Sequence, residues 1–157
     1  MLVQRNVYAK SVLNGLMLAG AKAVFLEPQV DESSGLATAP STETVAAALT
    51  AYPEAKGVLV TMPNYYGMGT DLAPLAEACH RHDVPLLVDE AHGAHYEQHP
   101  RLPRSALASG ADVVVNRRTR CWPRSPWEPC CTSRSGEPRT APPAARHGAK
   151  LEPIPTR

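Results

Sequence analysis

Two adjacent acidic residues, Asp89 and Glu90, follow directly on a short apolar run within residues 85–100, PLLVDEAHGAHYEQHP. Three histidines, His92, His95 and His99, come after them in the same stretch. Side chains of these types can ligate a metal ion, hold magnesium beside a nucleotide, or bind the nitrogen of a cofactor ring. The surrounding sequence has to decide between these three kinds of site.

An ATPase and a metal site are two of the alternatives. A strand followed by D-E-A-H has the form of a Walker B box, but the sequence holds no glycine-rich loop ending in G-K-[ST] to bind the phosphates. For a metal site, Asp89, His92, His95 and His99 are all ligand types. His95 and His99 would share one face if the segment were helical, although Gly93 makes a helix there doubtful. A metal-binding module that uses His92, His95 and His99 therefore stays open as an alternative.

A pyridoxal phosphate pocket is the third alternative. Asp89 ends a buried apolar run, and a carboxylate there would keep a pyridine nitrogen protonated and make the ring an electron sink. Ala91 is small enough to leave room beside the ring, and His92 adds an imidazole. This order of residue types suits the cofactor.

Alternating helices and strands position the acidic stretch. Apolar periodicity predicts helices at 10–19, 42–52, 71–82 and 103–110, and strands at 23–27, 57–62, 85–89 and 111–115. Gly20 is placed to end the first of these helices. Short apolar strands between amphipathic helices predict an α/β fold with a parallel sheet that is covered on both faces. Ligands of such sheets bind at the carboxyl ends of the strands, where the polar clusters MPNYYG (62–67) and DEAHGAH (89–95) lie.

Several motifs agree with one known family in order and spacing. RNVYAKSVLNGLMLAGAKAVFL (5–26), GVLVTMPNYYG (57–67) and LLVDEAHGAHYEQHPRLPRSALASGADVVV (86–115) resemble the Orn/Lys/Arg decarboxylase family, over residues 1–115 in all. The resemblance implies part of the major domain of a three-layer, aminotransferase-like fold that binds pyridoxal phosphate. In that family the phosphate-binding loop lies upstream of the matching segment, so we expect a partial domain.

The resemblance also implies roles for individual residues. Asp89 would pair with the pyridine nitrogen, Ala91 would pack against the ring, and His92 would lie beside cofactor or substrate as a catalytic residue. Tyr8 stands where the family places a ring-stacking histidine in R-N-x-H-K-S, with one extra residue before the lysine. Asn64 stands where the family usually has threonine. The implied activity is decarboxylation of a basic amino acid, as in polyamine biosynthesis, by a homodimer with sites at the interface.

The lysine that would hold the cofactor through a Schiff base is missing. The family carries it in Q-S-T-H-K after the strand that 111–115 matches, whereas this chain continues N-R-R-T-R, and its lysines are Lys10, Lys22, Lys56 and Lys150. One possible back-translation of residues 115–122, with the first two bases of the codon for Pro123, is GTC AAT CGA CGC ACA AGA TGC TGG CC. With one C inserted after GTC, these bases read V-Q-S-T-H-K-M-L-A. We therefore expect an out-of-frame segment and a chain that is inactive as written, and a non-catalytic remnant stays open as an alternative.

Composition changes at the same point. Residues 1–115 carry 7 Lys and Arg against 12 Asp and Glu, whereas residues 116–157 carry 9 against 3, together with 8 of the 16 prolines. Residues 116–157 are predicted to form a disordered Pro/Arg-rich tail, either out of frame or a genuine extension. The net charge of +1 argues against a nucleic-acid surface, and the sequence holds neither a membrane span nor a signal peptide, so a cytoplasmic protein is expected.

Overall fold

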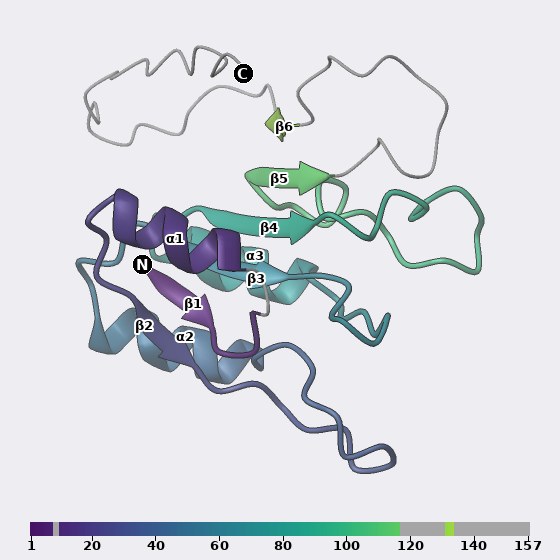
Figure 1. Ribbon diagram of the computed structural model, residues 1–157, viewed down its shortest axis with the longest axis horizontal. Helices are drawn as coiled ribbons and strands as arrows, with labels where there is room; N and C mark the ends of the chain where they lie inside the picture. Colours follow the sequence, from purple (N-terminus) through teal and green to yellow (C-terminus); the bar gives the residue numbers. More distant parts are fainter. Residues whose placement is uncertain (8–9, 117–130, 134–157) are drawn as a thin grey trace, which may run out of the picture.

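A six-stranded sheet organises the part of the chain that the computed structural model describes, residues 1–7, 10–116 and 131–133 (Figure 1). The strand order is β2-β1-β3-β4-β5-β6, with the first five strands parallel and β6 antiparallel to β5. The predicted parallel α/β fold is therefore confirmed. In chain order the elements are β1 (Leu2–Gln4), α1 (Lys10–Leu18), β2 (Val24–Leu26), α2 (Thr42–Ala51), β3 (Val58–Thr61), α3 (Ala73–Arg81), β4 (Leu86–Glu90), β5 (Val113–Asn116) and β6 (Cys131–Ser133).

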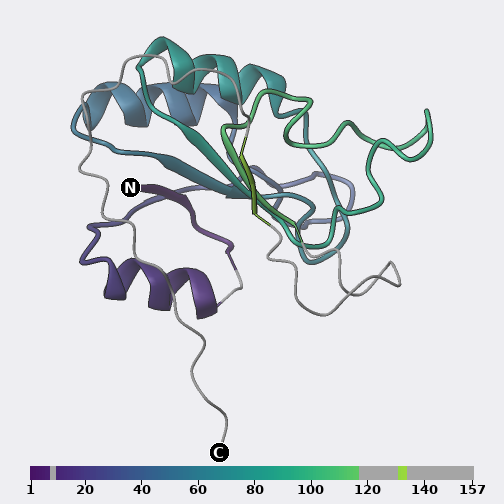
Figure 2. The ribbon, with the colours of Figure 1, turned by 90° about the horizontal axis from the view of Figure 1, so that it is seen from above.

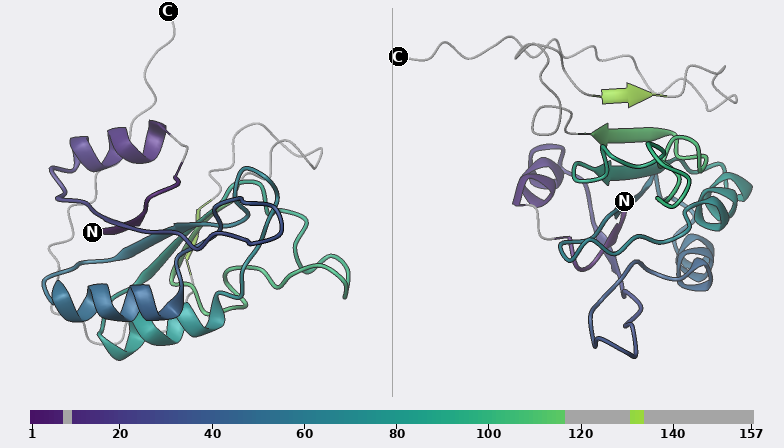
Figure 3. Two further views of the ribbon diagram at one scale, coloured as in Figure 1. Left: turned by 90° about the horizontal axis from the view of Figure 1, so that it is seen from below. Right: turned by 90° about the vertical axis from the view of Figure 1, so that its right-hand side faces the viewer.

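Helices lie on both faces of the sheet, which gives the three expected layers. Figure 2 shows α2 and α3 on one face and α1 on the other, and both views of Figure 3 agree. The chain runs from β1 outward to the edge strand β2, then returns past β1 to β3 and β4. Because crossovers between parallel strands are right-handed, this reversal moves the following helices to the opposite face. The reversal puts a topological switch point between β1 and β3, and such points are where α/β sheets bind ligands.

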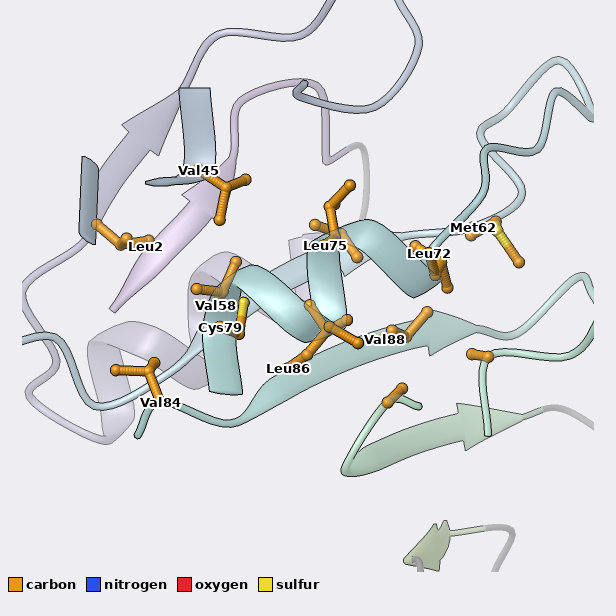
Figure 4. Packing of buried hydrophobic residues seen from close by; sticks show 14 of the residues in the cluster. Leu2, Val45, Val58, Met62, Leu72, Leu75, Cys79, Val84, Leu86 and Val88 are labelled. Carbon is orange, nitrogen blue, oxygen red and sulfur yellow. The ribbon is translucent and has the colours of Figure 1, made fainter. Parts of the chain in front are cut away.

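The main core fills the space between the sheet and the helices α2 and α3. Val58 and Val60 of β3 align with Leu86 and Val88 of β4, and all four are at most 1% exposed. Burial of these β-branched and leucine side chains is the main contribution to stability, at about 25 cal/mol per Å² of apolar surface. The side chains of this core that Figure 4 labels are Leu2, Val45, Val58, Met62, Leu72, Leu75, Cys79, Val84, Leu86 and Val88.

Cys79 of α3 is fully buried in this core. Burial raises the pKa of its thiol to about 12, and the charge of Asp112 adds to the effect. Because the thiolate is the reactive form, we expect Cys79 to resist iodoacetamide at pH 8 in the folded protein and to react in urea. Peptide mass mapping measures this, and equal labelling with and without urea would contradict it.

A residue with positive φ follows α1 and another follows α3. After α1 it is Gly20 (φ 61°), as the sequence predicts, and after α3 it is Asp83 (φ 55°). At Asp83 the N–H donates to the carbonyl of His80, and the N–H of Val84 donates to that of Cys79, which together form a Schellman motif. A side chain with a Cβ is strained in this conformation. We therefore expect Asp83→Gly to raise the free energy of unfolding by up to about 1 kcal/mol in urea titrations, and Asp83→Ala to lower it.

Residues 103–110 differ from the prediction, and residues 116–157 are described only in part. The helix predicted over 103–110 is wrong, because residues 106–110 form turns that end at Gly110 (φ 99°). The N–H of Ala106 donates to Oε1 of Glu90 at 2.8 Å, and this tertiary contact holds the segment in its turns. Of the predicted tail, Asn116 ends β5 and Cys131–Ser133 form β6, while the rest lies outside the described residues. Within the described ranges no helix is long and apolar enough to cross a membrane.

Candidate functional site

Asp89 lies at the carboxyl end of β4, one strand away from the switch point. It aligns with Thr61 of β3 and Val115 of β5, so it points to the sheet face that carries α1, opposite the main core. Its Oδ1 accepts a hydrogen bond from the N–H of Ala91 at 3.1 Å. Its Oδ2 has no hydrogen-bond partner among the described residues. The bond to Oδ1 therefore fixes the orientation of the side chain, and Oδ2 can accept a hydrogen bond from a ligand.

Thr61 is the site residue that the sequence did not single out. It occupies the position next to Asp89 on the neighbouring strand, and its backbone N–H donates to Oε1 of Gln4 at 3.0 Å. Its Oγ1 is buried and has no partner within the described part of the chain. A buried hydroxyl without a partner costs about 1–3 kcal/mol, so it marks a place where a further polar group fits. Only the register of the sheet brings this hydroxyl beside Asp89.

Buried amide side chains hold the neighbouring strand ends in place. Gln4, at the end of β1, donates from Nε2 to the carbonyl of Thr38 at 3.3 Å and to Oδ1 of Asn6 at 2.7 Å. Asn64, after β3, donates to the carbonyl of Ala37 at 3.0 Å, and its Oδ1 accepts the N–H groups of two later residues of its own turn. Since each amide bonds to segments far away in sequence, the loops at this edge form one connected unit.

The turn after β4 is packed tightly around Glu90, Gly93 and Tyr96. Glu90 is 2% exposed, and its Oε1 accepts the N–H of Ala106 at 2.8 Å. The N–H of Gly93 donates to the carbonyl of Glu90 at 2.9 Å, and that of Tyr96 donates to the carbonyl of Gly93 at 2.9 Å. Tyr96 joins the main core. Asp89 and Glu90 end β4, and the rest of DEAHGAH forms a compact turn, not a helix.

The histidines of this stretch do not converge. His92, His95 and His99 are all exposed, and the ring of His95 contacts that of Tyr96 edge-on. Within the described residues, no group of three or more His, Cys, Asp or Glu side chains could hold a metal ion. The metal-binding alternative is therefore not supported. His92 follows Asp89 within the turn, whereas Tyr8 lies outside the described residues, so the cofactor roles predicted for both stay predictions.

The residues at this edge fit the ring end of pyridoxal phosphate. Asp89 offers an oxygen that has no hydrogen-bond partner among the residues that the structure describes. Thr61 offers a buried hydroxyl beside it, and Ala91 is a small, half-buried side chain directly after β4. A carboxylate that faces the pyridine nitrogen is the arrangement that keeps this ring protonated. The donor set therefore suits the nitrogen end of the ring, while the sequence supplies no lysine just after β5.

Burial makes the titration of Glu90 measurable as a change in stability. Burial raises the pKa of its carboxyl, hydrogen bonds from Ala106 and Asn116 lower it, and the charge of Glu97 raises it again, with a net upward shift. A raised pKa means that the folded state holds the proton more tightly than the unfolded state. Stability from this proton is complete below the ordinary glutamate pKa of about 4.3 and is lost as pH rises through the folded pKa.

We therefore expect Glu90→Gln, which is neutral at every pH, to gain stability relative to the parent chain as pH rises from 4 to 8. Urea titrations of both proteins across this range give the difference between their free energies of unfolding. The contributions of the other carboxyl groups cancel in this difference. A difference that is constant over the whole range would contradict the prediction.

Known proteins match about three quarters of this chain. Residues 1–121 match the family described as "Orn/Lys/Arg decarboxylase, major domain". Arginine decarboxylases of Halalkalibacterium halodurans and Bacillus subtilis are 44% and 42% identical to it over 114 residues, which are 73% of this chain and 23% of each relative. The chain thus spans about a quarter of the length of these relatives. A PLP-bound putative aminotransferase from Clostridium difficile 630 superposes on 73% of the chain with a TM-score of 0.56 at 19% identity, covering 30% of that structure.

Proposed function

Because the chain belongs to the Orn/Lys/Arg decarboxylase family, we propose that it carries the part of a basic amino acid decarboxylase that binds the ring of pyridoxal phosphate. We also propose that the substrate is an amino acid, by analogy with the arginine decarboxylases that the chain resembles. When bound, pyridoxal phosphate supplies an electron sink that stabilises the charge left on an amino acid after loss of CO₂.

The observation that carries the proposal is the setting of Asp89. Its Oδ1 is held by the N–H of Ala91, and its Oδ2 faces no partner among the described residues at the carboxyl end of β4. In this proposal Asp89 holds the proton on the ring nitrogen, and Ala91 and His92 lie against the ring. A partly buried carboxylate is suited to this role, because its charge is less screened there than in bulk water.

We propose further that the chain is inactive as written. Residues 117–121 after β5 read R-R-T-R-C, and the lysines of the chain are Lys10, Lys22, Lys56 and Lys150. A lysine amine is the group that binds this cofactor covalently. Residues 116–157 are, in this proposal, an out-of-frame segment, and one restored base after the codon of Val115 returns the lysine within Q-S-T-H-K.

The first test is to resequence the gene across the codons for Val113 to Arg124. An extra C that restores Q-S-T-H-K would show that the segment is a sequencing error. If the deletion is real, borohydride treatment with pyridoxal phosphate is expected to leave no modified lysine at the site, and peptide mass mapping shows this. In the frame-restored chain the adduct is expected on the new lysine, and its absence there would contradict the proposal.

The role of Asp89 is tested separately by equilibrium dialysis against pyridoxal phosphate. In the frame-restored chain Asp89→Asn is expected to weaken binding about tenfold or more, since it removes a charge-assisted hydrogen bond worth about 1.5–3 kcal/mol. Glu77→Gln, an exposed acid-to-amide change on α3, is the matched control and is expected to bind like the parent. Equal binding by both variants would overturn the assignment of Asp89.

A further inference from the structure

Glu90 follows Asp89 in sequence but lies on the other face of β4. It points to the side of α3, is 2% exposed, and aligns with Asn116 of β5. Burial of a carboxylate is unfavourable because the charged group loses its water, unless hydrogen bonds satisfy its oxygens. Its hydrogen bonds therefore indicate what the side chain does in the fold.

The carboxylate of Glu90 joins three separate parts of the chain. Its Oε1 accepts the N–H of Ala106 at 2.8 Å, and its Oε2 accepts Nδ2 of Asn116 at 3.3 Å. Its backbone carbonyl accepts the N–H of Gly93 at 2.9 Å. The side chain thus ties the end of β4 both to the far end of the following loop and to β5. The contact with Ala106 is the shorter of the two side-chain bonds.

Gly93 locks the turn against this side chain. A Cβ built on Gly93 would lie 2.5 Å from Cγ of Glu90 and 3.0 Å from the ring of Tyr96. The turn that begins at Glu90 includes Ala91, whose N–H holds Oδ1 of Asp89. Glu90 therefore holds the backbone at Ala91 in place, and the N–H of Ala91 in turn orients the carboxylate of Asp89.

We propose that Glu90 is a positioning residue, which acts from the far face of β4 to hold the turn that orients Asp89 toward the ring nitrogen. The role in cofactor binding rests on the proposed function, whereas the effect on the orientation of Asp89 does not. The effect on the orientation of Asp89 is tested by four amide-exchange profiles: the full chain, Glu90→Ala, Glu90→Gln and Asp89→Ala.

The N–H of Ala91 reports the orientation of Asp89, and that of Ala106 reports the bond to Glu90. Glu90→Ala is expected to speed exchange at both positions about tenfold, the factor for one lost hydrogen bond to a charged group. Glu90→Gln keeps an acceptor oxygen and is expected to stay within about threefold of the parent. Asp89→Ala is expected to speed exchange at Ala91 and to leave Ala106 unchanged.

Each outcome decides the proposal. Unchanged exchange at Ala91 in Glu90→Ala would overturn it, as would equal acceleration in Glu90→Gln and Glu90→Ala. Acceleration at every buried amide of β3 and β4 would show general destabilisation instead, and would also overturn it. Dialysis of the frame-restored chain against pyridoxal phosphate tests the proposed function on its own. If the frame-restored chain fails to bind while Ala91 responds as expected, the proposed function fails and the positioning of Asp89 by Glu90 stands.

Discussion

Replacing Leu86 by alanine is expected to lower the free energy of unfolding by about 2–5 kcal/mol. Leu86 begins the central strand β4, is 0% exposed, and aligns with Val58 of β3. Its removal leaves a cavity between the sheet and α3 that the surrounding strands can fill only in part. Typical domains have a free energy of unfolding of about 5–15 kcal/mol, so this loss is a large fraction of the total. Urea titration followed by far-ultraviolet circular dichroism measures it.

A matched leucine on α1 controls for the chemical change. Leu18 is 90% exposed, and Leu18→Ala is expected to change the free energy of unfolding by no more than about 0.5 kcal/mol. Similar losses in the two variants would show that the core does not lie between the sheet and α3.

Gly93→Ala, which adds a single methyl group, is expected to lower the free energy of unfolding by about 1–3 kcal/mol. The new Cβ would lie 2.5 Å from Cγ of Glu90 and 3.0–3.1 Å from two ring carbons of Tyr96, and all three residues are buried. Neither neighbour is the free end of an exposed side chain, so the turn itself has to shift. We expect urea titration to show the lower stability, and amide exchange to show faster opening between Ala91 and Ala106.

Gly15 offers the same substitution in open space. It lies within α1, and no atom outside its own helix lies within 4 Å of a Cβ built there. Gly15→Ala is expected to raise the free energy of unfolding by up to about 1 kcal/mol, because alanine has the higher helix propensity. Opposite signs for the two glycines are the expected result. Destabilisation by both substitutions would contradict the steric explanation at Gly93.

The sequence determined the order of the elements and the position of the acidic stretch. Short apolar strands and amphipathic helices are local patterns, so the strands β2 to β5 and the helices α1 to α3 were predictable from neighbouring residues. The conformation of residues 103–110 was not predictable in this way, since a short apolar segment can form either a helix or a series of turns. Its turns are held by Glu90 through Ala106, a contact across 16 residues that no local pattern encodes.

The sequence also predicted that Asp89 would follow a buried strand, and that such a carboxylate suits a protonated ring. Only the tertiary structure decided what lies around it. The strand register brought the buried hydroxyl of Thr61 beside Asp89, and the alternation of side chains along β4 sent Glu90 to the opposite face. The same packing left His92, His95 and His99 exposed and apart. These arrangements depend on contacts between distant strands and loops, because sheet register and loop closure are set by the whole fold and not by neighbouring residues.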